Sequence, residues 1–401
     1  MSPATPLNES YDAVVIGGGV VGASTAYHLA RLGAGRVALF ERDAICSGGT
    51  AQSCAIVRSH YSIPTNTRLA LQSLAMFEDF AAALEDEEAD AGFVNSGYLI
   101  LAPEGEIADK LAANLAMQAG VGAETRAIDA AEAKALHPWL ALDDIAVIGY
   151  EPRSGYADPH RTTTSFANAA RKRGVVLNTN RAVLGLIRDG DRVTGIETAA
   201  GRVGAGLVVS AVGPWSAAVG RWAGLDLPLE ISRHIVVTYR TEEIYTSTLP
   251  VVKDLTTANK MYFRPTWDGV VLVGTGDHGD PVDGADDLDG MVDLAFVAHQ
   301  GQQLAHRVPD AADAAYTRSW VGPYDITPDW NPVLGPAPGI DGLHLAYGFS
   351  GHGFKLAPAV GQVLAQTALG MVPDVDIAPY RLTRFAEGDL LTGAYGIGSI
   401  S

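Results

Sequence analysis

A glycine-rich turn near the N-terminus constrains the fold of this chain more than any other feature. An apolar run at residues 13–16 is followed by Gly17, Gly19 and Gly22 in the spacing G-x-G-x-x-G, and then by a helical stretch at residues 23–32. In such a strand–turn–helix unit, the first glycine permits the tight turn, the second lets a pyrophosphate approach the backbone, and the third lets helix and strand pack closely. The free N–H groups at the helix N-terminus then favour bound phosphate.

An acidic residue follows this turn at the distance that a ribose requires. A second apolar strand at residues 37–40 ends in Glu41, nineteen residues after Gly22, where a carboxylate can accept hydrogen bonds from both hydroxyls of a ribose. The alternative, a glycine-rich turn that binds nothing, explains the glycines but not the terminal acid. The segment therefore predicts an adenine dinucleotide site, and the motif itself fits FAD and NAD equally well.

The size and charge of the chain limit its other functions. With 401 residues, of which 47% are hydrophobic, the chain is long enough for two domains. Its formal net charge of −18 argues against nucleic acid or an anionic membrane surface as a partner, because both would repel it. No apolar run is long enough to span a bilayer, and the N-terminus lacks the apolar core of a signal peptide. The two cysteines, Cys46 and Cys54, indicate neither a zinc site nor a disulfide framework, so we expect a cytoplasmic protein without a bound metal.

A second glycine-rich junction lies near the C-terminal end of the chain. An apolar strand at residues 343–346 leads into the sequence GFSGHGFK at residues 348–355, which opens a helix that runs to Leu369. NAD enzymes have no standard need for such a junction. A flavin does, because its reduced ring carries negative charge near N1 and the C2 carbonyl, where a helix N-terminus stabilises it. The second junction therefore favours FAD.

Four stretches of the sequence carry a family resemblance. They are the N-terminal glycine motif, IVRSHY at residues 56–61, AVGPWS at 211–216 and GFSGHGFKLAPAVG at 348–361. In these stretches the chain resembles the FAD-dependent amine oxidoreductases related to sarcosine oxidase, glycine oxidase and dimethylglycine dehydrogenase, which belong to the D-amino-acid oxidase superfamily.

The resemblance implies an α/β fold with two domains that are both discontinuous in the sequence. One is a Rossmann-like FAD-binding domain, and the other is an α+β substrate domain built on a mixed sheet that covers the flavin. A block after the first helices fits a nucleotide fold poorly and reads as an inserted piece of the second domain. We expect the FAD-binding domain in residues 1–87, 149–223 and 320–401, and the substrate domain in residues 88–148 and 224–319.

The resemblance also implies the residues of the site. In sarcosine oxidases, an arginine at the position of Arg58 and a lysine at that of Lys355 hold the substrate carboxylate, and a tyrosine at that of Tyr324 lines the same pocket. The residues expected to contact FAD are Gly17, Gly19, Val20, Val21, Gly22, Glu41, Arg42, Ser47, Gly48, Gly49, Thr50, Ser53, Cys54, Ala55, Val183, Ala211, Gly213, Trp215, Gly351, His352, Gly353, Phe354 and Lys355.

Three positions depart from the pattern of single-chain sarcosine oxidases. Gly322 stands where those enzymes attach FAD through a cysteine, which implies non-covalent FAD. Leu272 stands where they use a lysine to promote reaction with oxygen, and Ala55 where they often have a second arginine. These two changes favour a dehydrogenase, although Lys260 or Arg264 could supply a cation from a neighbouring strand.

The predicted reaction is oxidation of a secondary or N-methylated amino acid, such as sarcosine, proline or dimethylglycine, to an imine that water hydrolyses. Two alternatives stay open: a primary amino-acid or 2-hydroxy-acid oxidoreductase that uses the same two cations, and a flavoprotein subunit of a larger complex. The expected partners are a small carboxylated amine and oxygen or another electron acceptor. A homo- or hetero-oligomer is compatible with the sequence.

Overall fold

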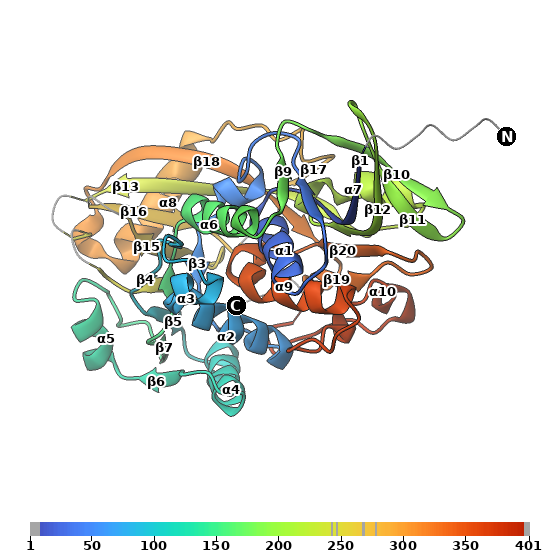
Figure 1. The fold of residues 1–401 in the computed structure, drawn as a ribbon. Helices are drawn as coiled ribbons and strands as arrows, with labels where there is room; N and C mark the ends of the chain where they lie inside the picture. The colour runs from blue at the N-terminus through green and yellow to red at the C-terminus, as the bar shows by residue number, and fades with distance from the viewer. Residues whose placement is uncertain (1–8, 242–243, 246–247, 267–268, 277–278, 397–401) are drawn as a thin grey trace.

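The computed structural model describes residues 9–241, 244–245, 248–266, 269–276 and 279–396. The predicted residues 1–8 and 397–401 of the FAD-binding domain lie outside the described part of the chain. Two large sheets dominate the molecule, with helices packed between and around them (Figure 1). The mixed α/β architecture that the sequence predicts is confirmed.

The first sheet has eight strands, among them those of the predicted dinucleotide motif. They are β1 (Glu9–Ile16), β2 (Val37–Phe40), β9 (Val176–Asn178), β10 (Val183–Asp189), β11 (Arg192–Thr198), β12 (Gly201–Ser210), β19 (Val333–Pro336) and β20 (Leu343–Tyr347). Their order is β10-β11-β12-β1-β2-β9, with β20 beside β12 and β19 beside β20. The central strands β20, β12, β1, β2 and β9 pair in parallel, so their carboxyl ends meet at one edge.

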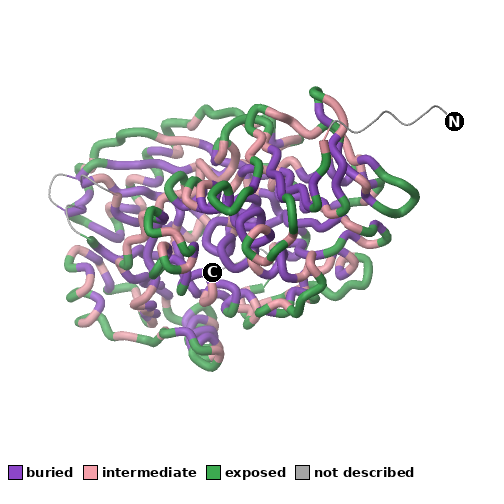
Figure 2. Tube along the Cα trace, viewed as in Figure 1, coloured by how far each residue is buried: buried purple, intermediate pink, exposed green. Residues whose placement is uncertain are grey.

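Helices cover both faces of the first sheet. The side chains of β1 point alternately to the two faces, and they are apolar on each. Ala13 and Val15 pack in a core formed with α1 (Val20–Arg31), α2 (Pro64–Glu78), α3 (Phe80–Leu84), α6 (Pro159–Lys172) and α9 (Gly353–Ala368). Val14 and Ile16 pack in a second core on the other side, with α7 (Ser216–Ala223). Figure 2 shows these central segments as buried.

The second sheet has nine strands. They are β5 (Tyr98–Ala102), β6 (Arg126–Ile128), β7 (Val147–Glu151), β13 (Glu230–Arg240), β14 (Val251–Asp254), β15 (Tyr262–Pro265), β16 (Val270–Gly274), β17 (Pro281–Val282) and β18 (Ala315–Ile326). Their order is β17-β13-β16-β15-β14-β5-β7-β6, with β18 paired to β13. The sheet is mixed, because β14 and β5 are parallel whereas the other pairs are antiparallel. Helices α4 (Glu106–Gly120), α5 (Ala130–Leu136) and α8 (Leu294–Arg307) accompany it, and a small sheet joins β3 (Ile56–Val57), β4 (Val94–Asn95) and β8 (Gly155–Tyr156).

Two strands of the second sheet cross the predicted domain boundaries at residues 149 and 320. β7 pairs with β5 as far as Glu151, and β18 pairs with β13 as far as Ile326. The division of the chain into two domains therefore stays a prediction, while the backbone pairing extends the second sheet past both boundaries.

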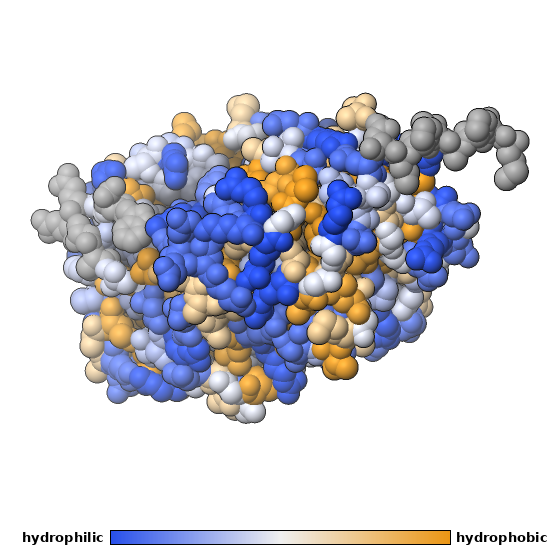
Figure 3. Space-filling view, in the orientation of Figure 1, coloured by the Kyte–Doolittle hydropathy of each residue, from blue (hydrophilic) through white to orange (hydrophobic). Residues whose placement is uncertain are grey.

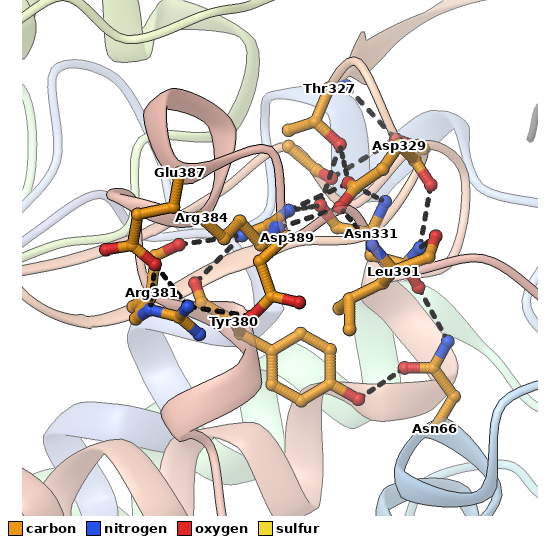
Figure 4. Close-up of polar contacts among 12 residues, drawn as sticks. Asn66, Thr327, Asp329, Asn331, Tyr380, Arg381, Arg384, Glu387, Asp389 and Leu391 are labelled. Carbon is orange, nitrogen blue, oxygen red and sulfur yellow. Dashed lines mark hydrogen bonds and ion pairs between the residues drawn. The ribbon is translucent and has the colours of Figure 1, made fainter.

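A buried ion pair holds the C-terminal segment against the first sheet (Figure 4). Arg384, in α10 (Arg384–Glu387), is fully buried and contacts both oxygens of Asp329 at 2.8 Å. Arg384 also donates to the backbone carbonyl of Asn331 at 2.7 Å. The side-chain oxygen of Asn331 in turn accepts a hydrogen bond from Asn66 of α2 at 2.8 Å. Tyr380 donates to the same Asn66. Because every group of this buried network has a polar partner, the network is compatible with the dry interior.

Candidate active site

One cavity of about 780 Å³ collects the predicted site residues from both sheets. This volume lies within the range of ligand and cofactor sites. Its lining includes Gly17, Gly19, Val20, Val21, Glu41, Arg42, Ser47, Gly48, Gly49, Thr50, Ser53, Cys54, Ala55, Arg58, Val183, Ala211, Gly213, Trp215, Tyr324, Gly351, His352, Gly353, Phe354 and Lys355. Of the predicted contacts, Gly22 alone is not among the lining residues, since it faces the β1–α1 turn instead.

The glycines of the first motif are required by the backbone around them. Gly17 has φ of +107°, and a Cβ there would lie 2.4 Å from the carbonyl oxygen of Ala211 on the neighbouring strand connection. A Cβ on Gly22 would lie 1.9 Å from the carbonyl oxygen of Gly17. The N-terminus of α1 therefore begins directly at the cavity wall, with no acidic residue in its first turn. This arrangement fits the diphosphate of a dinucleotide.

A carboxylate and a hydroxyl flank the same turn. Glu41 accepts a hydrogen bond from the N–H of Gly18 through Oε2 at 2.6 Å and lines the cavity at the end of β2. Thr50, in a short 3-10 turn over Gly49–Gln52, accepts from the N–H of Val20 at 3.2 Å. The donor and acceptor set at this end of the cavity matches the ribose and phosphates of FAD.

Arg42 lies at the mouth of this end rather than inside it. Its guanidinium stacks 4.2 Å from the ring centre of Trp215 and contacts Asp43 and Asp286 at 3.1 and 3.2 Å. Trp215 donates its indole N–H to Asp286 at 2.8 Å. Asp286 comes from the loop after β17 of the second sheet, whereas Arg42 follows β2 of the first sheet. These contacts therefore connect loops from the two sheets at the cavity. No sequence motif pointed to Asp286.

The second glycine junction places another helix N-terminus at the cavity. Asp325, at the end of β18, accepts from the N–H of Gly348 through its carboxylate at 2.7 Å and from the N–H of Ser350 through its carbonyl at 2.9 Å. These bonds fix the turn before α9, which begins at Gly353 and has no acidic residue in its first turn. Burial raises the pKa of Asp325 to about 6. The positive end of the α9 dipole thus faces the cavity, where it favours negative charge.

Three buried cations gather at the far end of the cavity. Arg58, which follows β3, and Lys355, in α9, are the two residues predicted to form a carboxylate clamp and are 6% and 8% exposed. The third, Lys253 of β14, is 5% exposed and was not predicted. None of the three has an ion pair within the described residues. The only signal for Lys253 in the sequence is a lysine directly after the apolar pair Val251 and Val252.

Arg58 is held in place through His60. Its Nη1 donates to the carbonyl of His60, and its guanidinium lies 4.7 Å from the ring centre of Tyr61. The His60 ring contacts Gln118 of α4 at 3.0 Å and the hydroxyl of Tyr395 at 3.2 Å. Burial lowers the pKa of His60 to about 3, so the ring is neutral at physiological pH. These contacts leave the guanidinium available to a ligand in the cavity.

Burial also weakens the charge of the two lysines. Burial, together with the nearby charge of Arg58, lowers the pKa of Lys253 to about 7 and the pKa of Lys355 well below its usual value. Because these groups repel one another and none of them has an ion pair within the described residues, a bound carboxylate would favour their protonated forms. The electrostatics of this end therefore favour an anionic ligand.

The hydroxyl of one tyrosine connects the predicted Tyr324 to two further side chains. The hydroxyl of Tyr262 lies 2.9 Å from the sulfur of Cys54, 2.8 Å from Nε2 of His234 and within hydrogen-bond contact of Tyr324. The rings of His234 and Tyr324 stack with their centres 4.2 Å apart. Burial raises the pKa of the Cys54 thiol, which therefore stays protonated. Tyr262 and His234 line the cavity and were not predicted.

The positions that depart from sarcosine oxidases lie in or near the same cavity. Gly322 and Ala55 line it, whereas Leu272 is buried beside Cys54 and Tyr262 in a small apolar cluster. Of the two alternative cations, Lys260 lines the cavity. Arg264 lies behind the wall, where it donates to the carbonyls of Cys54 and Pro265 at 2.8 and 2.9 Å.

The described part of the chain contains neither a membrane-spanning helix nor a candidate metal site. There, no helix has the length and apolar character needed to cross a bilayer. The same residues contain no cluster of three or more histidine, cysteine, aspartate or glutamate side chains arranged to hold a metal ion. The face of the molecule in Figure 3 is mostly hydrophilic, with apolar side chains in scattered groups.

Comparison with known proteins assigns the chain to a family. The family model described as FAD dependent oxidoreductase (DAO) matches residues 12–367. The chain is 31% identical to mitochondrial sarcosine dehydrogenase of Homo sapiens over 397 residues, which cover 96% of this chain and 42% of that protein. It therefore spans less than half the length of that relative. It is also 29% identical to glycine oxidase of Geobacillus kaustophilus, covering 94% of this chain and 98% of the relative.

The solved structures agree. L-proline dehydrogenase from P. horikoshii matches with a TM-score of 0.87 and 28% identity, covering 96% of this chain and 100% of that one. The glycine oxidase structure from Geobacillus kaustophilus matches with a TM-score of 0.81 and 29% identity. The family match, the relatives and the glycine cradle of the cavity agree, and the chain belongs to the FAD dependent oxidoreductase family, whose cofactor is FAD.

Proposed function

We propose that this flavoenzyme oxidises a secondary or N-methylated amino acid to an imine, which water then hydrolyses. The observation that carries the proposal is the pair Arg58 and Lys355, two buried cations that line the same cavity without an acidic partner within the described residues. When bound, FAD supplies the acceptor for the hydride equivalent that leaves the substrate carbon. Two relatives, sarcosine dehydrogenase and L-proline dehydrogenase, are named for secondary amines and support this class of substrate. Glycine oxidase is named for a primary amino acid and fits the alternative.

In this proposal, the residues of the chain bind and orient the substrate. Arg58 meets the carboxylate with two parallel N–H groups, and Lys355 meets it as a point charge. The stacked rings of Tyr324 and His234 form an apolar wall beside them. The predicted FAD contacts around Gly17 and Glu41 hold the cofactor at the other end, and Gly351 lies between the two ends, beside Tyr324 and Lys355. Orientation in a dry cavity is the contribution that the protein makes to the rate.

The wider assignments follow the same reasoning. We propose that the two sheets belong to an FAD-binding and a substrate domain that meet at the cavity, and that the partners are a carboxylated amine and an electron acceptor. A cytoplasmic location stays a prediction, as does assembly into an oligomer.

The decisive experiment is anaerobic titration of the purified, yellow protein with sarcosine, proline, dimethylglycine and a 2-hydroxy acid. We expect the flavin absorbance to bleach with at least one of the amines and to persist with the hydroxy acid. Bleaching by the hydroxy acid alone would replace the proposed function with the hydroxy-acid alternative. Absence of bleaching with the whole panel would favour a subunit whose activity requires another chain.

We predict that FAD is bound non-covalently. Gly322 has no side chain to attach it, Cys46 is not among the lining residues, and the buried thiol of Cys54 contacts Tyr262. Acid precipitation should therefore leave the yellow colour in the supernatant. Colour in the pellet would contradict the prediction and would direct attention to His234 and His352, the histidines of the cavity wall.

We also predict that the reduced enzyme reacts slowly with oxygen and faster with an artificial dye or quinone. Oxygen first gains an electron to give superoxide, which a nearby buried cation stabilises. Leu272 supplies no such charge. Stopped-flow mixing of photoreduced enzyme with air and with a dye measures both rates. If the rate with air equals the rate with the dye, the prediction is wrong, and Lys260→Met then tests whether Lys260 supplies the cation.

A further inference from the structure

We propose that Lys253 forms a second anion subsite, so that the preferred substrate is a dicarboxylate: an amino acid whose side chain or N-substituent carries a further carboxylate. This inference rests on the proposed function, because it specifies the substrate class of the same cavity. It concerns a residue for which neither the motifs nor the family resemblance supplied a role.

Lys253 is positioned by the second sheet rather than by the glycine motifs. It lies in β14, opposite Ile100 of β5 and Tyr262 of β15. Its ammonium group lies 5.4 Å from the ring centre of Tyr262, and a Cβ on Gly276 would lie 2.9 Å from its Nζ. Strand and ring thus hold a long, flexible side chain in a narrow space that opens into the cavity.

The acidic residues near Lys253 are already engaged elsewhere. Its neighbour Asp254 is fully buried and pairs with Arg307 of α8 at 2.7 Å, while its other oxygen accepts from Thr256. Glu151 accepts hydrogen bonds from Ser59 and Ser154 instead. Lys253 therefore has no ion pair within the described residues, and Asp254, which is paired with Arg307, acts on it only at a distance.

One carboxylate does not balance the charge of this end of the cavity. A bidentate contact with Arg58 occupies both oxygens of a carboxylate, and Lys355 can approach the same group as a point charge. Lys253 then remains as a third basic group, whose protonated form is disfavoured by burial and by the charges of Arg58 and Lys260, which line the same cavity. Since a buried charge without a partner is costly, a ligand that brings a second carboxylate fits this end better than a ligand with one.

The first test measures binding alone and does not depend on turnover. The FAD-loaded protein is titrated with succinate and with butyrate, two unreactive acids of the same carbon number, and the change in the flavin spectrum gives each Kd. We expect succinate to bind at least about tenfold more tightly. In Lys253→Met that ratio should fall at least about tenfold, whereas Lys134→Met, an exposed lysine of α5, should keep it.

A second readout separates anion binding from a merely structural role. The groups that face Lys253 are Arg58, Lys260, Asp254 and Tyr262, with Lys355 across the cavity. Because burial lowers the pKa of Lys253 to about 7, a bound anion should raise it. Binding of succinate at pH 8 should therefore be accompanied by proton uptake by the protein. Calorimetry in buffers of different ionisation enthalpy measures this uptake, which Lys253→Met should reduce.

The second test uses substrates in matched pairs: iminodiacetate with N-ethylglycine, and N-methylaspartate with N-methyl-2-aminobutyrate. We expect the dicarboxylate of at least one pair to have the higher kcat/KM. Lys253→Met should lower the ratio of kcat/KM between the dicarboxylate and its monocarboxylate partner at least about tenfold.

The inference is overturned if succinate binds no more tightly than butyrate to the wild-type protein. It is also overturned if Lys253→Met weakens both acids by the same factor, since Lys253 would then serve the first carboxylate or accept the amine proton. If no amine is oxidised but succinate keeps its advantage, the proposed function fails and the anion subsite stands.

Discussion

Arg58→Met is expected to lower kcat/KM for a carboxylated amine by about 10- to 150-fold while leaving FAD bound. The guanidinium is buried, lines the cavity and has no ion pair within the described residues, so its bidentate fork is directed to a ligand. A charge-assisted hydrogen bond contributes about 1.5–3 kcal/mol, which corresponds to that range of rates. Steady-state kinetics with the best substrate of the amine panel gives the ratio, and the absorbance ratio of flavin to protein gives the cofactor content.

Two controls make this result specific. Arg58→Lys keeps the charge but loses the planar fork, so it should recover only part of the activity. Arg126→Met removes an exposed arginine that pairs with Glu132 far from the cavity lining, and should leave kcat/KM unchanged. If Arg58→Met lowers the rate with an uncharged amine as much as with its carboxylated analogue, the guanidinium does not bind the carboxylate.

Gly22→Ala is expected to yield protein with little or no bound FAD and a lowered melting temperature. The added methyl group would lie 1.9 Å from the carbonyl oxygen of Gly17, well inside van der Waals contact. To relieve this overlap, α1 must move away from β1, which removes its N-terminal N–H groups from the phosphate position. The flavin absorbance of purified protein and a thermal melt with and without added FAD measure the two effects.

The matched control is Gly120→Ala, at the end of α4. A Cβ at this glycine meets no heavy atom within 4 Å, so the substitution adds a methyl group to a helix without a clash. It should leave both flavin content and melting temperature close to wild type. A Gly22→Ala protein with full flavin content would show that α1 can shift without disturbing the cofactor site.

The local motifs of the sequence predicted the first sheet and its cofactor end well. The glycine spacing, the acid after β2 and the junction before α9 each act over a few residues, and their physical requirements are visible in the sequence. In the structure, Gly17, Glu41 and Gly351 all line the same cavity.

The substrate end was harder to predict because it depends on long-range pairing. β14 is four residues long, and its parallel neighbour β5 lies about 150 positions earlier in the chain, so no local pattern indicates that Lys253 faces the cavity. The roles of Lys260 and Arg264 were equally open. Only the register of β15 places the Arg264 side chain behind the wall, against the carbonyl of Cys54.

The cavity draws on both ends of the sequence, and this has a consequence for biosynthesis. Gly17 is available early in translation, whereas Lys355 and the α9 N-terminus leave the ribosome only after most of the chain has been made. A complete cofactor site therefore cannot exist until the segment that contains α9 has been synthesised. Because FAD binds the folded state selectively, its cellular concentration should set how much of the newly made protein escapes proteolysis.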